Sequence, residues 1–288
     1  MSAAAPDPVL VTGATGTVGR MLTAGLAAQG VLPRVMLRPG SESAPPEGGV
    51  PVRADADDPA SLRAAFSGVR SLFLLTPLGR RQDLRHARLL EAAERAGVEW
   101  IVKVSALGAD PASPVPVHRE HGLSDAALAA SGIPHAVLRP NAFMQNTAQW
   151  RATIERMGAI RLPMGRSRVS MVDARDVAAA ACAALVAPGP GPVAVDLTGP
   201  EALSYDEIAA AVSGAAGVPV RYCDVSPEEA AEGMRANGMP DWAIESRLAL
   251  YATIRAGEAE AVTDGVRMLT GRPPRRLADL LAETGYPL

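Results

Sequence analysis

Short apolar runs alternate with segments of helical periodicity through the first half of the chain. The apolar runs, which are typical of buried strands, cover residues 9–11, 35–37, 50–52, 69–76, 100–105 and 133–138. Between the runs, apolar side chains recur three and four positions apart, as they do at Leu89, Ala92, Ala93 and Ala96. Strand and helix in repeated alternation predict a parallel sheet that helices cover on both faces.

The second half of the chain has a less regular pattern. We expect strands at residues 169–172, 193–197 and 220–225, and helices at 173–186, at 204–216 and onward to the C-terminus. Ser204 and Glu207 have the spacing of a capping box, which supports a helix start at that point. The glycines and prolines of residues 189–192 indicate a turn or linker.

These patterns predict an α/β fold, with a Rossmann-type doubly wound parallel sheet and a smaller C-terminal α/β substrate lobe. The Rossmann domain is expected to span residues 1–142, with residues 168–188 returning to it. The lobe is expected to comprise residues 143–167 and 189–288. Sheets of this kind bind ligands beyond the carboxyl ends of their strands, so the residues that follow each strand are the first candidates for a site.

Composition narrows the class of protein. The chain has 288 residues, 48% of them hydrophobic, and a net charge of -3 without a basic stripe, so we expect no nucleic-acid partner. It has no apolar stretch of membrane-spanning length and no signal-peptide pattern in residues 1–8, so we expect a cytoplasmic protein without a membrane partner. Cys182 and Cys223 lack metal-site spacing and are expected to be buried free thiols, with no metal bound. The abundance of alanine, glycine and arginine is typical of a GC-rich bacterial gene.

A glycine-rich segment directly follows the first predicted strand and opens a predicted helix. Gly13 permits a tight turn, Gly16 lets the backbone approach a pyrophosphate, and Gly19 lets the helix pack on the sheet. The free N–H groups and positive dipole end of the helix favour an anion there. Because the segment has the required strand–turn–helix context, we expect it to bind a dinucleotide through Gly13, Thr15, Gly16, Thr17, Val18 and Gly19.

The end of the second predicted strand indicates which dinucleotide is bound. NAD-binding folds place an acidic residue there, whereas this chain has Arg38 followed by Ser41. An arginine attracts a 2′-phosphate and can bind it with two hydrogen bonds, so we expect NADP(H). The alternative is that Arg38 is one more solvated arginine in an arginine-rich chain. Asp55, after the third strand, is expected to meet the adenine edge or to cap a helix, with Ala56 beside the ring.

The ends of the later strands supply further candidates. We expect Thr76 and Pro77 to pass close to the ribose and pyrophosphate, and Ser105 to face the nicotinamide ribose. Pro140, Asn141 and Phe143 are expected to border the nicotinamide. Lys103 is the one lysine among 28 basic residues, and it lies within a predicted central strand. Burying its amine costs free energy unless the amine reaches a partner or the ligand cleft, so we expect a cofactor-binding or catalytic role for it. The alternative is a lysine that snorkels at a strand end.

The motifs occur in a familiar order. They are TGATGTVG at residues 12–19, LLTPLG at 74–79, VKVSALGA at 102–109, SGIPHAVLRPNAFMQN at 131–146, VDARDVA at 172–178 and LTGPEALSYDEIA at 197–209. The chain resembles the NmrA-like branch of the atypical short-chain dehydrogenases/reductases over nearly its whole length. The resemblance implies an NADP-binding Rossmann domain with a small C-terminal lobe. It also implies either a reductase of quinones or other small organic acceptors, or a cofactor-binding redox sensor.

The sequence departs from the wider reductase superfamily at the helix that should carry a tyrosine and, four residues later, a lysine. This helix has His121 and Asp125 instead, which share a face at that spacing. Hydride delivery to a carbonyl leaves an oxyanion that needs a proton or a positive neighbour. We expect His121 to supply the proton and Asp125 to orient it. The alternative is that His121 is a surface histidine near a helix start.

Residues after the sixth strand are candidates for the substrate wall. These residues are Phe143, Met144, Asn146 and Trp150, although a methionine or tryptophan at helical spacing is more often part of a core. Asp173 and Asp176 precede an alanine-rich segment and are expected to be helix caps.

The function that we expect is reduction of a small organic acceptor, a quinone or a polyketide-like carbonyl, by NADPH. The alternative is a non-catalytic NADP(H)-binding regulator that reports redox state to a protein partner. Epimerase or dehydratase chemistry is disfavoured because the tyrosine–lysine pair is absent. The sequence leaves the oligomeric state open, a homodimer included.

Overall fold

The strands and helices divide between two units in the computed structural model, which describes residues 8–77, 79, 82–189, 191 and 193–286. Unit 1 comprises Met1–Ser113, His118–Arg139 and Val177–Val195. Unit 2 comprises Pro114–Val117, Pro140–Asp176 and Asp196–Leu288. The expectations about residues 1–7, about Leu78 of the LLTPLG motif and about parts of the 189–192 turn lie outside the described residues.

A seven-stranded sheet with the order β3-β2-β1-β4-β5-β6-β9 forms the centre of unit 1. The strands are β1 (Val9–Val11), β2 (Arg34–Leu37), β3 (Val50–Arg53), β4 (Ser71–Leu74), β5 (Trp100–Val104), β6 (His135–Pro140) and β9 (Val193–Leu197). The pairs β2–β3, β1–β2, β1–β4, β4–β5 and β5–β6 are all parallel. The predicted doubly wound parallel sheet is confirmed, with strand order reversing between β1 and β4.

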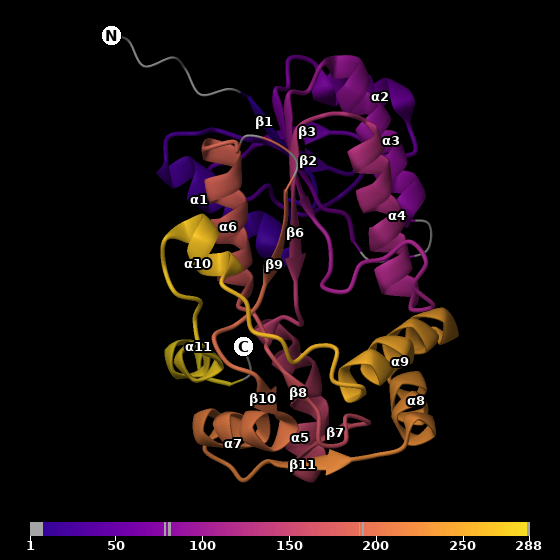
Figure 1. The fold of residues 1–288 in the computed structure, drawn as a ribbon, viewed down its shortest axis with the longest axis vertical. Helices are drawn as coiled ribbons and strands as arrows, with labels where there is room; N and C mark the ends of the chain where they lie inside the picture. Colours follow the sequence, from indigo (N-terminus) through magenta and orange to yellow (C-terminus); the bar gives the residue numbers. More distant parts are fainter. Residues whose placement is uncertain (1–7, 78, 80–81, 190, 192, 287–288) are drawn as a thin grey trace. The chain divides into compact units, whose positions relative to one another are not determined.

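Helices cover both faces of this sheet. They are α1 (Thr17–Ala28), α2 (Pro59–Phe66), α3 (Gln82–Ala96), α4 (Pro116–Ala130) and α6 (Ala174–Val186). Figure 1 shows α1 and α6 on one face and α2, α3 and α4 on the other. Every residue of β4 and β5 is buried, as expected of central parallel strands, whereas three of the four residues of the edge strand β3 are exposed.

The apolar stripes of the helices fill the space against the sheet. On the α2, α3 and α4 face, Phe66, Leu89 and Leu128 pack with strand residues such as Leu72 and Ile101 in one buried cluster. Burial of apolar surface at about 25 cal/mol per Å² is the main term that holds these layers together. In α3 the apolar spacing of Leu89, Ala92, Ala93 and Ala96 therefore indicated the face that packs inward. In α4 the residues at such spacing, Leu123, Ala126, Ala127 and Ala130, are exposed, so the sequence pattern indicated the wrong face.

The segment that returns to unit 1 differs from the expected residues 168–188. Residues 168–176 belong to unit 2, where β8 (Arg168–Val169) pairs antiparallel with β10 (Leu203–Ser204). Residues 189–195 belong to unit 1, because β9 is the seventh strand of its sheet. The expected strand at 169–172 is correspondingly short, since the Ser170 N–H donates to the Ala259 carbonyl at 3.0 Å and leaves the strand pairing.

Unit 2 mixes short strands with helices. Its remaining elements are the 3₁₀ helix η1 (Met144–Trp150), α5 (Arg151–Met157), β7 (Ala159–Leu162), α7 (Tyr205–Ala216), β11 (Arg221–Asp224), α8 (Pro227–Ala236), α9 (Asp241–Arg255), α10 (Gly265–Thr270) and α11 (Leu277–Thr284). β11 pairs parallel with β7, a strand that sequence reasoning missed. The capping box of Ser204 and Glu207 is confirmed at the start of α7. Within the described residues, no helix is both long and apolar enough to cross a membrane.

Candidate cofactor and acceptor site

The glycine turn after β1 has a geometry that only glycine allows. Gly13 has a φ of +63°, and a Cβ at this position would lie 2.7 Å from the carbonyl oxygen of Leu75. A Cβ on Gly19 would lie 2.3 Å from the Gly13 carbonyl oxygen. Thr12 ties the turn to the end of β4, since its hydroxyl donates to Leu75 O at 2.9 Å. The turn therefore packs directly against the end of the neighbouring strand.

The first turn of α1 begins at this glycine turn and keeps its amide donors. Its N-cap is Gly16, which has no side chain to accept from the helix, and no acidic residue lies in the first turn. Gly16 and Thr17 are exposed, and Val18 and Gly19 are buried. Orphan N–H groups and the positive end of the helix dipole make such a terminus an anion site. The backbone at this position fits the pyrophosphate of a dinucleotide.

Two arginines meet at the ends of β2 and β3. Arg53 donates from Nη1 to the carbonyl oxygens of Arg38 and Ser41, both at 3.0 Å, and so fixes the turn that follows β2. The Arg38 side chain is exposed. In the described part of the chain, neither guanidinium has a carboxylate partner. Sequence reasoning missed Arg53, although its position at the end of the adjacent strand was a usable signal.

Asp55 is used mainly in local structure. Its Oδ1 accepts from the Asp57 N–H at 2.9 Å, and its own N–H donates to the Ser61 hydroxyl at 3.0 Å. The N-cap of α2 is Asp58, which accepts from the Ala60 N–H at 2.9 Å. Of the two roles expected for Asp55, helix capping therefore belongs to Asp58. Contact of Asp55 or of Ala56 with adenine stays a prediction.

A buried charge network joins β5, β6 and α4. Lys103 is fully buried, and its Nζ donates to Asp125 Oδ1 at 2.6 Å. The Ser105 hydroxyl donates to Asp125 Oδ2 at 2.8 Å, and Arg139 Nη2 donates to the same oxygen at 3.3 Å. Lys103 therefore reaches a partner and does not snorkel. Pairing with Asp125 offsets part of the cost of burying its charge.

The expected orientation of His121 by Asp125 does not occur in the structure. The hydrogen bonds described for Asp125 go to Lys103, Ser105 and Arg139, and a bond to His121 is not among them. The reason is that Lys103, 22 residues earlier in the chain, supplies a stronger, charged donor to the same carboxylate. His121 is nevertheless buried, at 5% exposure, so it is not a surface histidine.

Two buried imidazoles lie near this network. The ring centroids of His86 on α3 and His121 on α4 are 6.5 Å apart, and His86 Nε2 lies 2.9 Å from the Thr76 hydroxyl. Burial, the Lys103 charge and His121 lower the pKa of His86 to about 2. Burial and Lys103 likewise lower the pKa of His121 to about 3, against an opposing effect of Asp125. Both rings are therefore neutral at physiological pH.

Pro140 and Asn141 lie at the end of β6, in unit 2. Asn141 Nδ2 donates to the Ser170 hydroxyl and to the Ala259 carbonyl, both at 2.9 Å, and its Oδ1 accepts from the Ala142 N–H. Both amide hydrogens are thus used inside unit 2. The side chain pins the end of β6, and a cofactor contact for Asn141 stays a prediction.

The four expected substrate-wall residues follow in unit 2. Met144 is 2% exposed and lies in the buried cluster of unit 2, as the core alternative predicted. Trp150 packs against that cluster, with its ring 6.3 Å from Tyr205. Phe143 and Asn146 are half-buried. Asn146 Oδ1 accepts from Gln149 at 3.1 Å.

Asp173 and Asp176 hold α6 and its surroundings, which agrees with a structural role. Asp173 accepts from the Arg175 N–H at 2.8 Å and from the Arg175 guanidinium. Asp176 pairs with Arg275, whose backbone N–H also donates to it at 2.7 Å.

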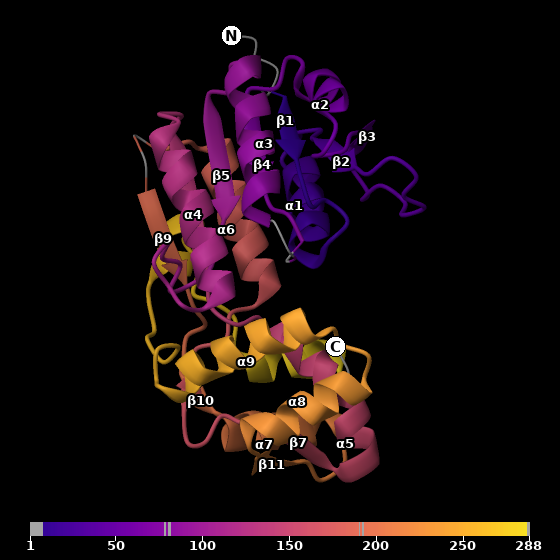
Figure 2. The same ribbon diagram turned by 90° about the vertical axis from the view of Figure 1, so that its right-hand side faces the viewer.

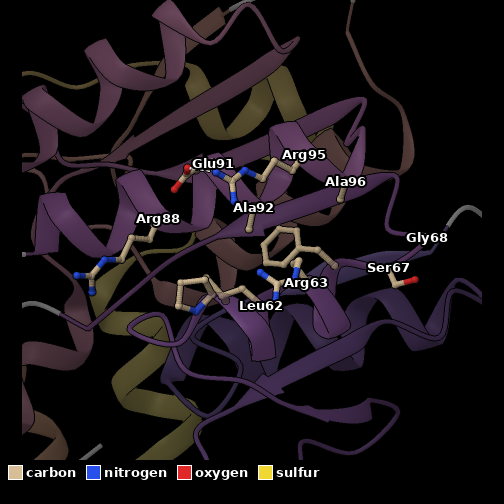
Figure 3. Close-up of a pocket in the computed structure, with 11 residues that line it drawn as sticks. Leu62, Arg63, Ser67, Gly68, Arg88, Glu91, Ala92, Arg95 and Ala96 are labelled. Atoms are coloured by element: carbon tan, nitrogen blue, oxygen red, sulfur yellow. Dashed lines mark hydrogen bonds and ion pairs between the residues drawn. The ribbon is translucent and has the colours of Figure 1, made fainter.

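A groove of about 390 Å³ lies between α2 and α3 (Figure 3). Leu62 and Phe66 are buried beneath it, and Arg63, Arg88 and Arg95 line its rim. Arg95 pairs with Glu91 at 2.6 Å, and Arg88 pairs with Asp57. None of the residues expected to bind cofactor or substrate lines the groove.

Comparisons with known proteins agree with this architecture. Residues 6–264 match the model of the NmrA-like family. The chain is 38% identical to the NAD(P)H azoreductase of Xenophilus azovorans, over 94% of this chain and 96% of the relative. It is 35% identical to the (4-alkanoyl-5-oxo-2,5-dihydrofuran-3-yl)methyl phosphate reductase of Streptomyces griseus subsp. griseus, over 96% and 97%. The triphenylmethane reductase of Citrobacter sp. complexed with NADP(H) superposes with a TM-score of 0.85 at 26% identity, covering 96% of this chain and 99% of that one.

The fold and the glycine turn define a dinucleotide-binding α/β protein. The chain belongs to the NmrA-like family. The residues present fit NADP(H) in two respects. The glycine turn leaves a cradle that a Cβ would fill. Arg38 and Arg53, which have no described carboxylate partner, lie at the ends of β2 and β3. The resemblance stated from the sequence is thereby confirmed.

Sequence reasoning missed Gln82 and His86. Gln82 and His86 lie one turn apart on the buried face of α3, followed on the same face by Leu89, Leu90 and Ala93. Polar residues on an otherwise apolar stripe were the signal that could have found them.

Proposed function

We propose that the protein is an NADPH-dependent reductase of a small conjugated organic acceptor. The observation that carries this proposal is the uncapped, glycine-lined N-terminus of α1 at the carboxyl edge of the sheet. The names of the two relatives describe an azo and an unsaturated furanone acceptor, and the resemblance of the motifs adds quinones. The shared chemistry is a conjugated double bond that takes up two electrons.

Preference for NADPH over NADH rests on Arg38 and Arg53. A 2′-phosphate at the end of β2 would lie near two guanidiniums. In the described chain, neither guanidinium is already paired with a carboxylate. Ser41 lies in the same turn and offers a hydroxyl.

The chain would act mainly by orientation and by hydrogen bonding. NADPH supplies a hydride when bound, and a proton from solvent completes the two-electron reduction. Ser105 donates its only proton to Asp125, so its lone pairs are left to accept hydrogen bonds from the nicotinamide ribose. His121 is neutral and offers one N–H donor to the reduced acceptor atom. Lys103 acts through Asp125 as a positioning residue.

We also propose different roles for residues of the two units. Unit 1 binds the cofactor, and Phe143, Asn146 and Trp150 of unit 2 supply substrate contacts. We also propose a cytoplasmic location, which the unpaired state of Cys182 and Cys223 supports.

Titration of the protein with NADPH and NADH, followed by nicotinamide fluorescence, tests the cofactor assignment. We expect NADPH to bind at least tenfold more tightly, and Arg38→Ala to remove most of the difference. Arg63→Ala is the matched control, because Arg63 is an exposed arginine on the rim of the α2–α3 groove. Equal affinity of the wild type for both cofactors would contradict the assignment.

Turnover is tested in the same cuvette by the loss of nicotinamide absorbance as menadione, methyl red or cyclohexenone is added. Oxidation of NADPH by any of these acceptors establishes a reductase. Tight binding of NADPH without oxidation across the panel favours the redox-sensing regulator instead. A light-scattering measurement on the same sample gives the oligomeric state.

A further inference from the structure

Three buried side chains of unit 1 carry polar atoms without partners. In the described part of the chain, both amide atoms of Gln82, Nδ1 of His86 and Nδ1 of His121 lack a hydrogen-bond partner. Gln82 is 1% exposed, His86 2% and His121 5%. Buried polar groups are nearly always hydrogen-bonded, so several orphans in one place indicate a missing partner atom.

The three side chains converge from two helices. Gln82 and His86 are four residues apart on α3 and so share a face. The ring of His121 on α4 lies 6.5 Å from that of His86 and is tilted by 59° to it. Figure 2 shows α3 and α4 on the same face of the sheet, with β4 and β5 beside them.

The group lies at the edge of the sheet where the proposed chemistry takes place. His86 contacts Thr76, which follows β4, and Lys103 near the end of β5 is close enough to lower the pKa of both imidazoles. Gln82 is the first residue of α3, the helix that follows β4. The carboxyl ends of parallel strands are where ligands of such sheets bind.

The side chains of the group itself favour an uncharged ligand atom. Beside them, the Lys103 ammonium and the partly exposed Arg139 guanidinium share the single carboxylate of Asp125. Neutral imidazoles and a carboxamide offer both N–H donors and acceptor lone pairs but no net charge. A carboxylate or sulfonate would lose its hydration in this buried place, and both described cations nearby already bond to Asp125, so its entry would carry a desolvation cost.

We propose that Gln82, His86 and His121 form the subsite that binds the uncharged carbonyl oxygen or azo nitrogen of the acceptor. This inference rests on the proposed reductase function and names the residues that hold its substrate. Burial strengthens each of the hydrogen bonds, because the surrounding dielectric is low. In the absence of acceptor the orphan atoms destabilise the protein, so the subsite is kept for binding rather than for stability.

The test pairs kinetics with thermal stability in Gln82→Met, which keeps the length of the side chain and removes its polar atoms. We expect KM for menadione to rise about five- to tenfold, with kcat and the Kd for NADPH unchanged. Without acceptor, we expect Tm to rise by about 2 °C or more, because a buried amide without partners is gone. Leu90→Met, on the buried face of the same helix, is the matched control and should leave KM unchanged.

An unchanged KM in Gln82→Met, or an equal rise in Leu90→Met, would overturn the subsite. A lower Tm with an unchanged KM would show that the three side chains hold only a structural water, which also overturns it. If none of the acceptors leads to oxidation of NADPH by the wild type, the proposed reductase function fails, independently of the subsite. The subsite is then judged on protein loaded with NADP⁺, where menadione must raise the Tm of the wild type but not that of Gln82→Met.

Discussion

At the scale of single residues, the Lys103–Asp125 pair places a fully buried cation against a carboxylate in unit 1. A lysine with no exposed surface is tolerated because a carboxylate lies 2.6 Å from its Nζ. Such a pair gives little net stability over an apolar replacement, but loss of one member leaves the other as a buried charge with fewer partners. The pair also fixes the Ser105 hydroxyl through the second oxygen of Asp125.

We predict that Lys103→Met destabilises the protein by about 3 kcal/mol, because Asp125 loses its charged donor. The double variant Lys103→Met/Asp125→Leu should recover most of this loss, since no unpaired charge remains. Urea unfolding of the three proteins measures the effect. A loss below about 1 kcal/mol in the single variant would contradict the prediction.

The two neutral histidines predict a pH dependence of stability. The pKa values of His86 and His121 in the folded protein, about 2 and 3, lie below the ordinary value of 6.5, so below pH 6.5 the unfolded chain binds more protons than the folded one. Their contribution to stability is full above pH 6.5 and is lost as the pH falls. Below pH 6.5, each histidine should lower the free energy of unfolding by roughly 1.4 kcal/mol for each pH unit.

Urea unfolding at pH 7.5 and 5.5 checks this sign. We expect the loss of unfolding free energy between the two pH values to be smaller in His86→Gln and in His121→Gln than in the wild type, because each variant removes one histidine that titrates only in the unfolded chain. The turnover rate should also lack an inflection near pH 6.5, since neither imidazole titrates there in the folded protein. A histidine-type inflection that disappears in His121→Gln would show that His121 is charged in the free enzyme.

At the scale of elements, the β1–turn–α1 unit combines stability and ligand binding in the same glycines. The turn packs so closely on the end of β4 that the backbone itself forms the surface offered to an anion. α3 shows a different compromise, with Gln82 and His86 on a face otherwise filled by leucine and alanine. The turn glycines therefore serve both stability and binding, whereas in α3 positions that would favour apolar side chains for stability carry polar residues suited to binding.

We predict that Gly13→Ala and Gly19→Ala each weaken NADPH binding by more than tenfold and lower Tm, because the new Cβ would lie under 3 Å from backbone atoms. Gly30→Ala is the matched control. Gly30 also has a positive φ, +78°, but a Cβ there meets no atom within 4 Å. It should cost only the strain of the left-handed backbone, about 1 kcal/mol, and leave the Kd unchanged. Fluorescence titration and thermal melts separate the two effects.

At the scale of the whole molecule, unit 1 is assembled from three separate stretches of chain. The last stretch supplies most of α6 and the start of β9. α6 contacts both β5 and α1 of unit 1. The Trp100 indole N–H donates to the Ala184 carbonyl at 2.9 Å, and a Cβ on Gly25 of α1 would lie 3.7 Å from Cys182 Sγ.

We therefore predict that a fragment of residues 1–142 does not fold on its own. Without α6, one face of the sheet exposes the apolar surface that this helix covers, and β6 becomes an unprotected edge. Circular dichroism and size-exclusion chromatography of the fragment should show aggregation or loss of cooperative melting. A fragment that melts cooperatively and binds NADPH would contradict the prediction.

The sequence by itself determined the order of strands and helices in the first half, the glycine turn, the basic residue after β2 and the family. These features depend on local periodicity and on turn chemistry, which neighbouring residues encode. Only the tertiary structure showed that Asp125 pairs with Lys103 rather than orienting His121, and that the rings of His86 and His121 lie 6.5 Å apart. It also decided the pairing of β7 with β11 and the bounds of the segment that returns to unit 1, which are 177–195 rather than the expected 168–188. These contacts join residues far apart in the chain, so they depend on which faces pack together, and a single sequence does not record that choice locally.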